Sequence, residues 1–391
     1  MEVRIKILLL EDSETDADLL IRHLRREKID FNHIRVWEKD AYLKQIDEFC
    51  PDIIIADYSL PQFNGVEAFR LMKNGGSNTP FILLTGSISE RIVNQLIKEG
   101  IDDYLLKDNL IRLSNIIMNV VYKRQLEMEK RKVEQKNKNI LDSINYAKRI
   151  QNAIFPPEEL IKELLPQSFI LFKPKDIVSG DFYWVEKFDN KTFIGAVDCT
   201  GHGVPGALLS IVGYNLLSKS INEHDHTKPS EILNELSNGI NKALRKNTEN
   251  PGMNDTMDIA LCAIDYAANT IEFSGAYNSL YLIRNKQLTV IQADRFPIGV
   301  YLNDELRKFT NHQIQMEKGD MIYIFTDGFA DQFGGTKGKK LKYNQFKKIL
   351  LSIHDLPLNE QKEALNTTIE QWKNMSKEEQ TDDILIIGVK T

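Results

Sequence analysis

The sequence predicts a multidomain protein in which an α/β domain is followed by a helical linker and then by an α+β domain. Three observations support this order. The first 120 residues alternate short apolar runs with amphipathic segments, the stretch from Tyr122 to Ile154 lacks Gly and Pro, and strand-like runs dominate after Phe169. A length of 391 residues is in keeping with two or three domains.

The first domain, assigned to residues 1–123, contains five strand-like apolar runs. Their near-continuous apolar character is typical of strands that are covered on both faces, and the helix-like segments between them suit crossover connections. The pattern therefore predicts a doubly wound, flavodoxin-like parallel sheet. The predicted strands are Ile5–Leu10, His33–Trp37, Asp52–Asp57, Phe81–Thr85 and Asp103–Lys107.

A helical linker is predicted over residues 124–155, where charge is dense and Pro156-Pro157 ends the pattern. Apolar residues recur in a 4-3 register that also contains polar positions, which is typical of a weak coiled-coil seam. We expect a homodimer through this linker, with a solvated spacer helix as the alternative. The apolar seam is Leu126, Val133, Ile140, Ile144, Ala147 and Ile154, and its polar positions are Lys130, Asn137 and Gln151.

The remaining residues, 156–391, combine clustered strands with a few long helices, which predicts β-sheets flanked by helices. The predicted strands are Phe169–Phe172, Phe182–Glu186, Thr192–Asp198, Ile259–Ile264, Thr270–Ser274, Leu280–Ile283, Met321–Thr326 and Asp383–Val389. The predicted helices are Ala207–Asn222, Pro229–Lys246, Lys342–Ile353 and Leu358–Trp372.

Composition excludes several classes of protein. Fifty basic and 56 acidic side chains give a net charge of −6, which argues against an overall basic nucleic-acid binder. The three cysteines, Cys50, Cys199 and Cys262, are scattered singly and form neither a disulfide framework nor a paired zinc motif. Neither a signal peptide nor an apolar run of about 18 residues is evident. We expect a cytoplasmic protein that binds neither membrane nor nucleic acid.

Polar residues gather where the strands of the first domain end. The carboxyl ends of parallel strands meet at one edge of a sheet, so Glu11, Asp12 and Asp57 should lie together. Three carboxylates repel one another unless a cation lies among them, and Mg²⁺ suits oxygen ligands. Thr85 and Lys107 would hold the oxygens of a phosphoryl group, which makes Asp57 a candidate nucleophile.

This arrangement resembles a response-regulator receiver domain. The resemblance implies that Asp57 is the phosphoacceptor, that Tyr104 is the aromatic switch residue, and that a histidine kinase is the upstream partner. Asp108 stands where the family usually has proline after the lysine, which leaves the local peptide geometry and the output surface open. A receiver that is not phosphorylated is the alternative.

A second set of aspartates lies beside glycines in the C-terminal domain. Asp198 and Asp327 each end an apolar run and precede a glycine-containing turn, while Asp181 and Asp382 occur in the segments Ser179-Gly180-Asp181 and Thr381-Asp382-Asp383. Four such carboxylates can hold two divalent metal ions about 4 Å apart, with an activated water between them. That chemistry hydrolyses phosphate esters without a cysteine or serine nucleophile.

These motifs resemble the SpoIIE-like branch of the metal-dependent protein phosphatases (PPM, or PP2C-type). The resemblance implies a protein serine/threonine phosphatase that uses two Mn²⁺ or Mg²⁺ ions. It assigns the ligands to Asp181, Asp198, Asp327 and Asp382, with Cys199 contributing its backbone carbonyl. Asp383 is the neighbouring alternative to Asp382. The substrate class implied is a phosphorylated anti-sigma-factor antagonist of the STAS type.

Two further residues stay open between a chemical and a structural role. His202 lies between two glycines and is either a general acid or a residue that caps the next helix or hydrogen-bonds locally. Asp258 either joins an additional metal ion or satisfies a backbone group.

The order of domains predicts that phosphorylation at Asp57 controls the phosphatase through the linker. A hybrid histidine kinase is excluded because no histidine lies between His33 and His202. A DNA-binding response regulator is disfavoured because spaced aspartates replace a basic C-terminal module. The remaining rival is a regulated partner-binding module with a degenerate, non-catalytic phosphatase domain.

Overall fold

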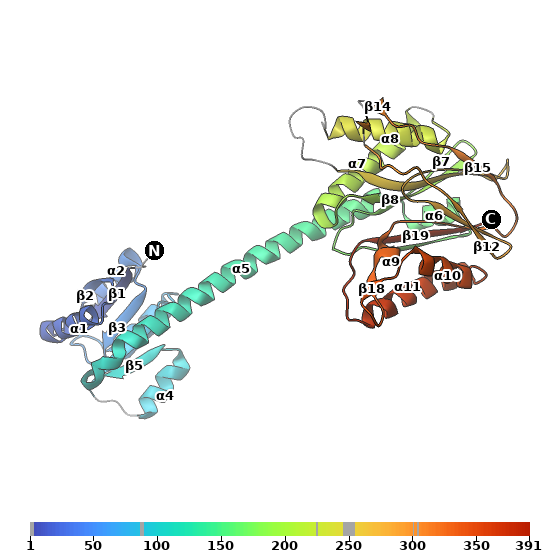
Figure 1. Ribbon diagram of the computed structural model, residues 1–391. Helices are drawn as coiled ribbons and strands as arrows, with labels where there is room; N and C mark the ends of the chain where they lie inside the picture. Colours follow the sequence, from blue (N-terminus) through green and yellow to red (C-terminus); the bar gives the residue numbers. More distant parts are fainter. Residues whose placement is uncertain (1–3, 87–89, 224–225, 245–254, 300, 303–304) are drawn as a thin grey trace. The chain divides into compact units, whose positions relative to one another are not determined.

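The computed structural model describes residues 4–391 except 87–89, 224–225, 245–254, 300 and 303–304. The chain forms two compact units, Met1–Lys138 and Asn139–Thr391. The boundary falls inside one helix, α5 (Leu113–Ile154), so each unit contains a part of it (Figure 1). No helix in the described part of the chain is both long and apolar enough to cross a membrane.

The N-terminal unit is a doubly wound parallel sheet, as the sequence predicts. The strands run in the order β2-β1-β3-β4-β5 and all neighbouring pairs are parallel. The bounds are β1 Ile5–Leu10, β2 Phe31–Val36, β3 Ile53–Asp57, β4 Phe81–Thr85 and β5 Asp103–Leu106. Four helices and a 3-10 turn alternate with them: α1 Glu14–Arg26, α2 Lys39–Phe49, α3 Gly65–Asn74, α4 Glu90–Glu99 and η1 Lys107–Arg112.

Helices cover both faces of this sheet. One core joins α1 and the first turns of α5 to the sheet, and the other joins α2 and α3 to its opposite face. Both cores are built from strand residues that are almost completely buried, which explains why the strands read as continuous apolar runs. Helix α2 ends at Cys50, an exposed residue with a left-handed backbone.

Helix α5 is continuous over 42 residues and begins eleven residues before the predicted linker, because Leu113–Val121 still pack on the receiver-like sheet. In its central part the apolar seam residues Leu126, Val133 and Ile140 are each more than half exposed. The helical linker is thus present, while pairing through its seam stays a prediction.

The C-terminal unit contains two five-stranded antiparallel sheets. The first has the order β15-β10-β9-β8-β7 and the second the order β12-β11-β16-β19-β6. The first comprises β7 Phe182–Phe188, β8 Lys191–Cys199, β9 Met257–Asp265, β10 Thr270–Ala276 and β15 His312–Gln315. The second comprises β6 Ser168–Lys173, β11 Leu280–Arg284, β12 Gln287–Ile291, β16 Met321–Phe325 and β19 Ile384–Lys390.

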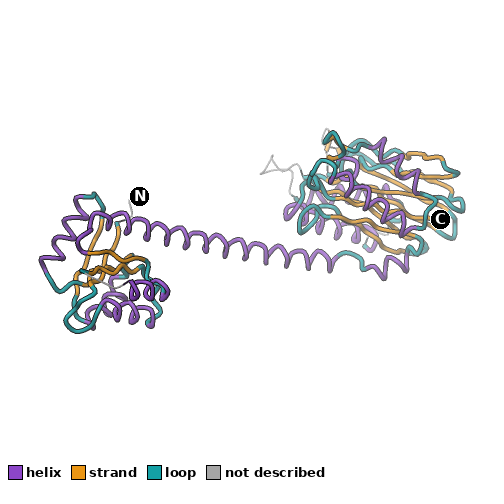
Figure 2. The backbone as a smooth tube through the Cα atoms, turned by 90° about the horizontal axis from the view of Figure 1, so that it is seen from below, coloured by secondary structure: helices purple, strands orange, loops and turns teal. Residues whose placement is uncertain are grey.

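The two sheets stack face to face between two pairs of helices (Figures 1 and 2). Helices α7 (Gly203–Asn222) and α8 (Pro229–Ala243) cover the first sheet, whereas α10 (Tyr343–Ile353) and α11 (Leu358–Asn374) cover the second. This is the predicted arrangement of sheets flanked by helices. The predicted end of the second helix at Lys246 lies outside the described residues. Shorter elements are α6 Glu158–Leu164, α9 Gly328–Asp331, β13 Tyr301–Leu302, β14 Glu305–Leu306, β17 Phe333–Gly334 and β18 Lys339–Lys340.

The end of α5 is part of this unit's core. Phe155, the residue after the helix, is buried, and its ring contacts those of Phe182 and Tyr214. Residues 139–155, which the sequence analysis placed in the linker, therefore belong to the C-terminal compact unit. The strands β12 and β15 were not predicted from the sequence, and both are only partly buried.

Two candidate carboxylate sites

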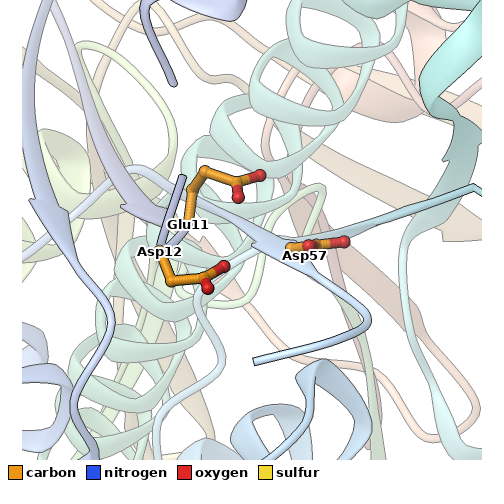
Figure 3. Close-up of side chains that lie close together, drawn as sticks. All are labelled: Glu11, Asp12 and Asp57. Atoms are coloured by element: carbon orange, nitrogen blue, oxygen red, sulfur yellow. The ribbon is translucent and has the colours of Figure 1, made fainter. Parts of the chain in front are cut away.

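The first site lies at the carboxyl ends of β1 and β3. Oxygens of Glu11, Asp12 and Asp57 all fall within 4.8 Å of one another, and Figure 3 shows the three carboxylates facing a common space. Glu11 and Asp57 are buried, while Asp12 is exposed. The parallel sheet thus brings together the three residues that the sequence analysis proposed as Mg²⁺ ligands.

Lys107 is the cation of this site. Its Nζ donates hydrogen bonds of 3.0 Å to Glu11 Oε2, Asp57 Oδ2 and Asp16 Oδ2. Asp16 was not predicted, because it lies in the first turn of α1 rather than at a strand end. Its signal in the sequence is the N-cap Ser13, whose hydroxyl accepts from the Asp16 backbone N–H and fixes that turn.

The site suits a divalent cation despite this lysine. Burial raises the pKa of Glu11, although hydrogen bonds from Lys107 and from the Ser13 backbone N–H act in the opposite direction. One ammonium therefore does not fully offset four neighbouring carboxylates. Oxygen ligands at the entrance, including exposed Asp12, fit Mg²⁺.

The other candidate receiver residues lie on β4, on β5 and in η1. Thr85 ends β4 and is buried, whereas Tyr104 on β5 is 37% exposed and faces outward. Asp108 is exposed in the turn η1, and the peptide bond before it is trans. Gly65 begins α3 so close to β3 that a Cβ there would lie 2.5 Å from the Asp57 carbonyl oxygen. A larger residue at this position would displace β3 and with it Asp57.

The second site lies where the two sheets of the C-terminal unit adjoin. Asp198 is near the end of β8, Asp327 follows β16, Asp181 precedes β7 and Asp382 precedes β19. Asp258 on β9 stands directly opposite Asp198 in the antiparallel ladder. Residues separated by up to 201 positions in the chain, Asp181 and Asp382, are thus brought into one acidic cluster.

The carboxylates of this cluster oppose one another's ionisation. Burial, followed by the charge of Asp198, raises the pKa of Asp181 well above its usual value, and burial followed by Asp327 does the same for Asp198. Burial and Asp382 raise the pKa of Asp327 to about 6. Burial and Asp327 raise that of Asp258 to about 7. Among the described residues, no lysine, arginine or histidine forms an ion pair with Asp181, Asp198, Asp327 or Asp382.

The carboxylates of this second cluster fit divalent cations. Asp181 Oδ2 is buried and has no hydrogen-bond partner in the described structure, which is costly unless an ion completes its environment. Hard oxygen ligands favour Mg²⁺ or Mn²⁺. In the described part of the chain, only the receiver trio brings three ligand atoms within 4.8 Å of one another. The second cluster is more widely spread, as suits ligands shared between two ions.

Asp383 has a different environment from Asp382. Its Oδ1 accepts from the backbone N–H of Lys175, and its Oδ2 accepts from those of Gly180 and Asp181. Both oxygens are thereby committed to the loop between β6 and β7. This geometry favours Asp382 as the metal ligand and makes Asp383 a residue that positions Asp181.

Gln151 holds the same loop from the other side. Its Nε2 donates to the Ser179 carbonyl at 2.7 Å and to Ser210 Oγ at 3.0 Å, while its Oε1 accepts from the Ser179 N–H at 3.1 Å. From the 4-3 register, Gln151 is predicted to be a polar position of the linker seam. In the structure it is buried and connects α5 to the segment carrying Asp181.

His202 and Cys199 border the cluster. His202 is the N-cap residue of α7 without a side-chain capping bond, and its Nδ1 lies 2.6 Å from Asp176 Oδ2. Cys199 is buried, and burial followed by the charge of Asp198 raises the pKa of its thiol well above normal, so the thiol stays neutral. A Cβ at Gly180 would lie 3.2 Å from the Cys199 carbonyl oxygen and 2.4 Å from that of Gly201. Only glycine allows this approach.

A parallel-sheet receiver unit and a PP2C-like unit with an acidic centre define a response regulator that carries a phosphatase-type domain. The receiver-domain family model matches residues 7–118, and the model described as stage II sporulation protein E (SpoIIE) matches residues 189–391. The chain belongs to the SpoIIE family. The predicted family resemblances are confirmed.

Individual proteins and solved structures are similar to parts of this chain. The SiaA-PP2C domain of Pseudomonas aeruginosa is 32% identical, with a TM-score of 0.59, and the match covers 66% of this chain and 98% of that domain. The response regulator protein GraR of Staphylococcus epidermidis is 25% identical over 56% of this chain and 92% of its own length. The SpoIIE phosphatase structure from Bacillus subtilis, with a regulatory fragment, matches at 18% identity and a TM-score of 0.45, covering 57% of this chain and 63% of that one.

Proposed function

We propose that this protein is a response regulator in which phosphorylation of Asp57 controls a metal-dependent protein serine/threonine phosphatase. The observation that carries the proposal is the second acidic cluster, where buried carboxylates from both sheets meet without a basic partner among the described residues. Such a cluster is stable only with bound cations or bound protons. The receiver unit at the other end of α5 supplies the regulatory input.

In the phosphatase site, Asp181, Asp198, Asp327 and Asp382 would hold two Mn²⁺ or Mg²⁺ ions. When bound, these ions supply the activation of water and the neutralisation of phosphoryl charge. Asp383 keeps the Asp181 loop in place, and the neutral Cys199 offers only its carbonyl. Asp258 is the candidate ligand for an additional ion. His202, oriented by Asp176, is the candidate donor of a proton to the serine or threonine oxygen that leaves.

In the receiver site, Asp57 would attack the phosphorus of a phosphohistidine on an upstream histidine kinase. The phosphoryl group passes to the aspartate, and the histidine nitrogen leaves. Mg²⁺ on Glu11, Asp12 and Asp57, together with Lys107 and Thr85, would stabilise the transferred charge. Tyr104 lies on β5 and Asp108 in the turn η1, which leads into α5. A conformational change on phosphorylation would reach α5 through these two elements.

The signal would reach the phosphatase site through α5. Gln151 at the end of this helix hydrogen-bonds both backbone groups of Ser179, two residues before Asp181. A shift of α5, including a change in pairing between two copies along the seam, would move this loop between two arrangements. Phosphorylation can favour either arrangement, so activation and inhibition are both open.

The proposed substrate is a phosphorylated anti-sigma-factor antagonist of the STAS type, in the cytoplasm. Family membership supports this substrate class, and the acidic net charge of −6 supports a protein rather than nucleic acid as the partner. The homodimer through α5 is proposed on the exposed apolar seam.

The experiment that tests the proposal is hydrolysis of para-nitrophenyl phosphate by the full chain with Mn²⁺, with and without beryllofluoride as a mimic of phosphorylated Asp57. We expect Mn²⁺-dependent turnover that changes when beryllofluoride is added. Turnover without any change would overturn the coupling. Absence of turnover with Mn²⁺ bound, checked also with a phosphoserine peptide, would favour the non-catalytic partner-binding module.

A further inference from the structure

A cleft of about 530 Å³ opens beside the phosphatase cluster. Asp258 and Asp327 form its border on the side of the acidic cluster. The rest of its lining comes from the β10–β11 loop, β11, β12 and the residue after it, the end of β16, and α10, and includes Tyr277, Asn278, Tyr281, Phe325, Tyr343 and Lys347. Its volume falls within the range of about 300–1,000 Å³ typical of ligand sites.

Tyr277 at this cleft has an unusual backbone. Its φ is +56°, in the left-handed region that aromatic residues rarely adopt, and its side chain is 53% exposed. The conformation is fixed by the hydrogen bond from its N–H to the Asp294 carbonyl and by the one from Asp294 N–H to Gly275. Strained residues of this kind persist where the fold over-determines them, and they cluster at binding sites.

Two polar groups at the cleft lack the partners that a closed protein surface would provide. The side-chain nitrogen of Asn278 is buried without a hydrogen-bond partner among the described residues. Lys347 lies over the Tyr281 ring, with its Nζ 5.2 Å from the ring centroid, and forms no ion pair with any described carboxylate. The cleft thus combines aromatic walls and one lysine with the two aspartates at its border.

We propose that this cleft binds an acidic segment of the phosphoprotein substrate that flanks the phosphorylated residue. This proposal rests on the proposed function, and it adds that the site selects substrates with acidic residues beside the phosphorylated one. With the phosphoryl group at the acidic cluster beside Asp258 and Asp327, the adjoining chain enters the cleft. Tyrosine side chains contact its backbone, and Lys347 pairs with a carboxylate. A lysine at the same place in the substrate would be repelled.

The test uses two synthetic phosphoserine peptides that differ only in carrying glutamates or lysines beside the phosphoserine. The full chain with Mn²⁺ should hydrolyse the glutamate peptide with a kcat/KM about tenfold higher. Lys347→Glu should erase or reverse this preference, and Tyr277→Ala should raise KM for the glutamate peptide severalfold. Lys348→Glu is the matched control, because Lys348 is exposed on the same helix outside the cleft. It should keep the wild-type ratio.

Peptide binding, measured by fluorescence anisotropy, separates this inference from the proposed function. An unchanged ratio of kcat/KM in Lys347→Glu, with the variant folded by circular dichroism, would overturn the cleft assignment while leaving the phosphatase intact. Absence of turnover on both peptides and on para-nitrophenyl phosphate would overturn the proposed function. In that case the assignment of the cleft as a peptide-binding site would be supported if Lys347→Glu weakens binding of the glutamate peptide and Lys348→Glu does not. Any other binding result would overturn it.

Discussion

The two acidic clusters of this chain differ in what offsets the repulsion between their carboxylates. In the receiver unit, Lys107 donates hydrogen bonds to three carboxylates at 3.0 Å each. In the C-terminal unit, the four candidate ligands have no such partner among the described residues. There, burial is the largest influence and repulsion between neighbouring carboxylates adds to it. Together they raise the pKa values of the four candidate ligands, Asp181, Asp198, Asp327 and Asp382.

The difference indicates how strongly each site depends on cations from solution. Because Lys107 donates to three of its carboxylates, we expect the receiver to keep its site geometry without Mg²⁺ and to need the ion mainly for phosphoryl transfer. The second cluster has to take up protons or metal ions before its carboxylates can lie together. Under the proposed function, the regulatory site would thus be assembled before Mg²⁺ binds, whereas the catalytic site would be completed by metal ions.

Replacement of Asp198 by alanine should have the largest effect. We expect Mn²⁺-dependent hydrolysis of para-nitrophenyl phosphate to fall about a hundredfold or more. The metal-free variant should melt no lower than the wild type, because one repelling carboxylate has been removed. Asp355→Ala, at an exposed position far from the cluster in sequence, is the control. Turnover retained in Asp198→Ala would contradict the ligand assignment.

Lys107→Ala should make the receiver site depend on a bound cation, as we expect for the second cluster. Loss of the ammonium leaves Glu11, Asp16 and Asp57 without their shared donor, which should lower local stability by about 1–3 kcal/mol in EDTA. Mg²⁺ should restore more stability to the variant than to the wild type. Hydrogen exchange of peptides from β1 and β3 measures this, with Lys98→Ala as the control. An equal response to Mg²⁺ in both proteins would show that Lys107 does not substitute for the ion.

The pH dependence of stability should also separate the two clusters. The pKa values of about 6 for Asp327 and about 7 for Asp258 exceed the ordinary 3.8, so the folded metal-free protein binds more protons than the unfolded chain between about pH 4 and pH 7. The free energy of unfolding then falls as pH rises through this window. Thermal melting in EDTA should show this fall, and Mn²⁺ should stabilise more at pH 8 than at pH 5.5.

The control for this pH dependence is Asp327→Asn, which removes one of the titrating groups. Its metal-free melting temperature should change less between pH 5.5 and pH 8 than that of the wild type. An identical change in both proteins would mean that other groups cause the pH dependence.

Gln151→Leu should have the smallest effect of the four. It removes the hydrogen bonds to Ser179 and Ser210 but keeps the size of the side chain. We expect about a tenfold loss in Mn²⁺ affinity or kcat, as for other residues that orient metal ligands. The neighbouring exposed Asn152→Ala should match the wild type. A Gln151→Leu protein with unchanged Mn²⁺ affinity, kcat and response to beryllofluoride would exclude this contact as the route of coupling.

Strand-end carboxylates were the part of both sites that sequence could predict. Asp57, Asp198 and Asp327 each follow an apolar run, and a buried strand determines where its next residue emerges. Asp16 lacked this signal because its position depends on how α1 packs over the sheet. Asp383 and Asp382 could not be distinguished either, since the choice depends on which side chain meets the backbone N–H groups of a loop 200 residues earlier.

Helix α5 shows a second limit of sequence reasoning. Its helical pattern was evident over the linker, but the pattern did not show that the helix begins as early as Leu113 or that Gln151 packs in the C-terminal unit. The strands β12 and β15 were missed because their half-buried faces weaken the apolar pattern. The local apolar pattern therefore predicted most helices and strands, whereas long-range packing determined which unit each segment of α5 contacts.

The three cysteines also make the chain convenient to label. Cys50 is exposed at the end of α2, whereas Cys199 and Cys262 are buried, and burial raises the pKa of both buried thiols. A maleimide dye or spin label should thus react with the receiver alone, without any cysteine being removed. Two labelled copies would report the separation of their receivers by energy transfer or by dipolar spectroscopy, while the unlabelled phosphatase turns over substrate.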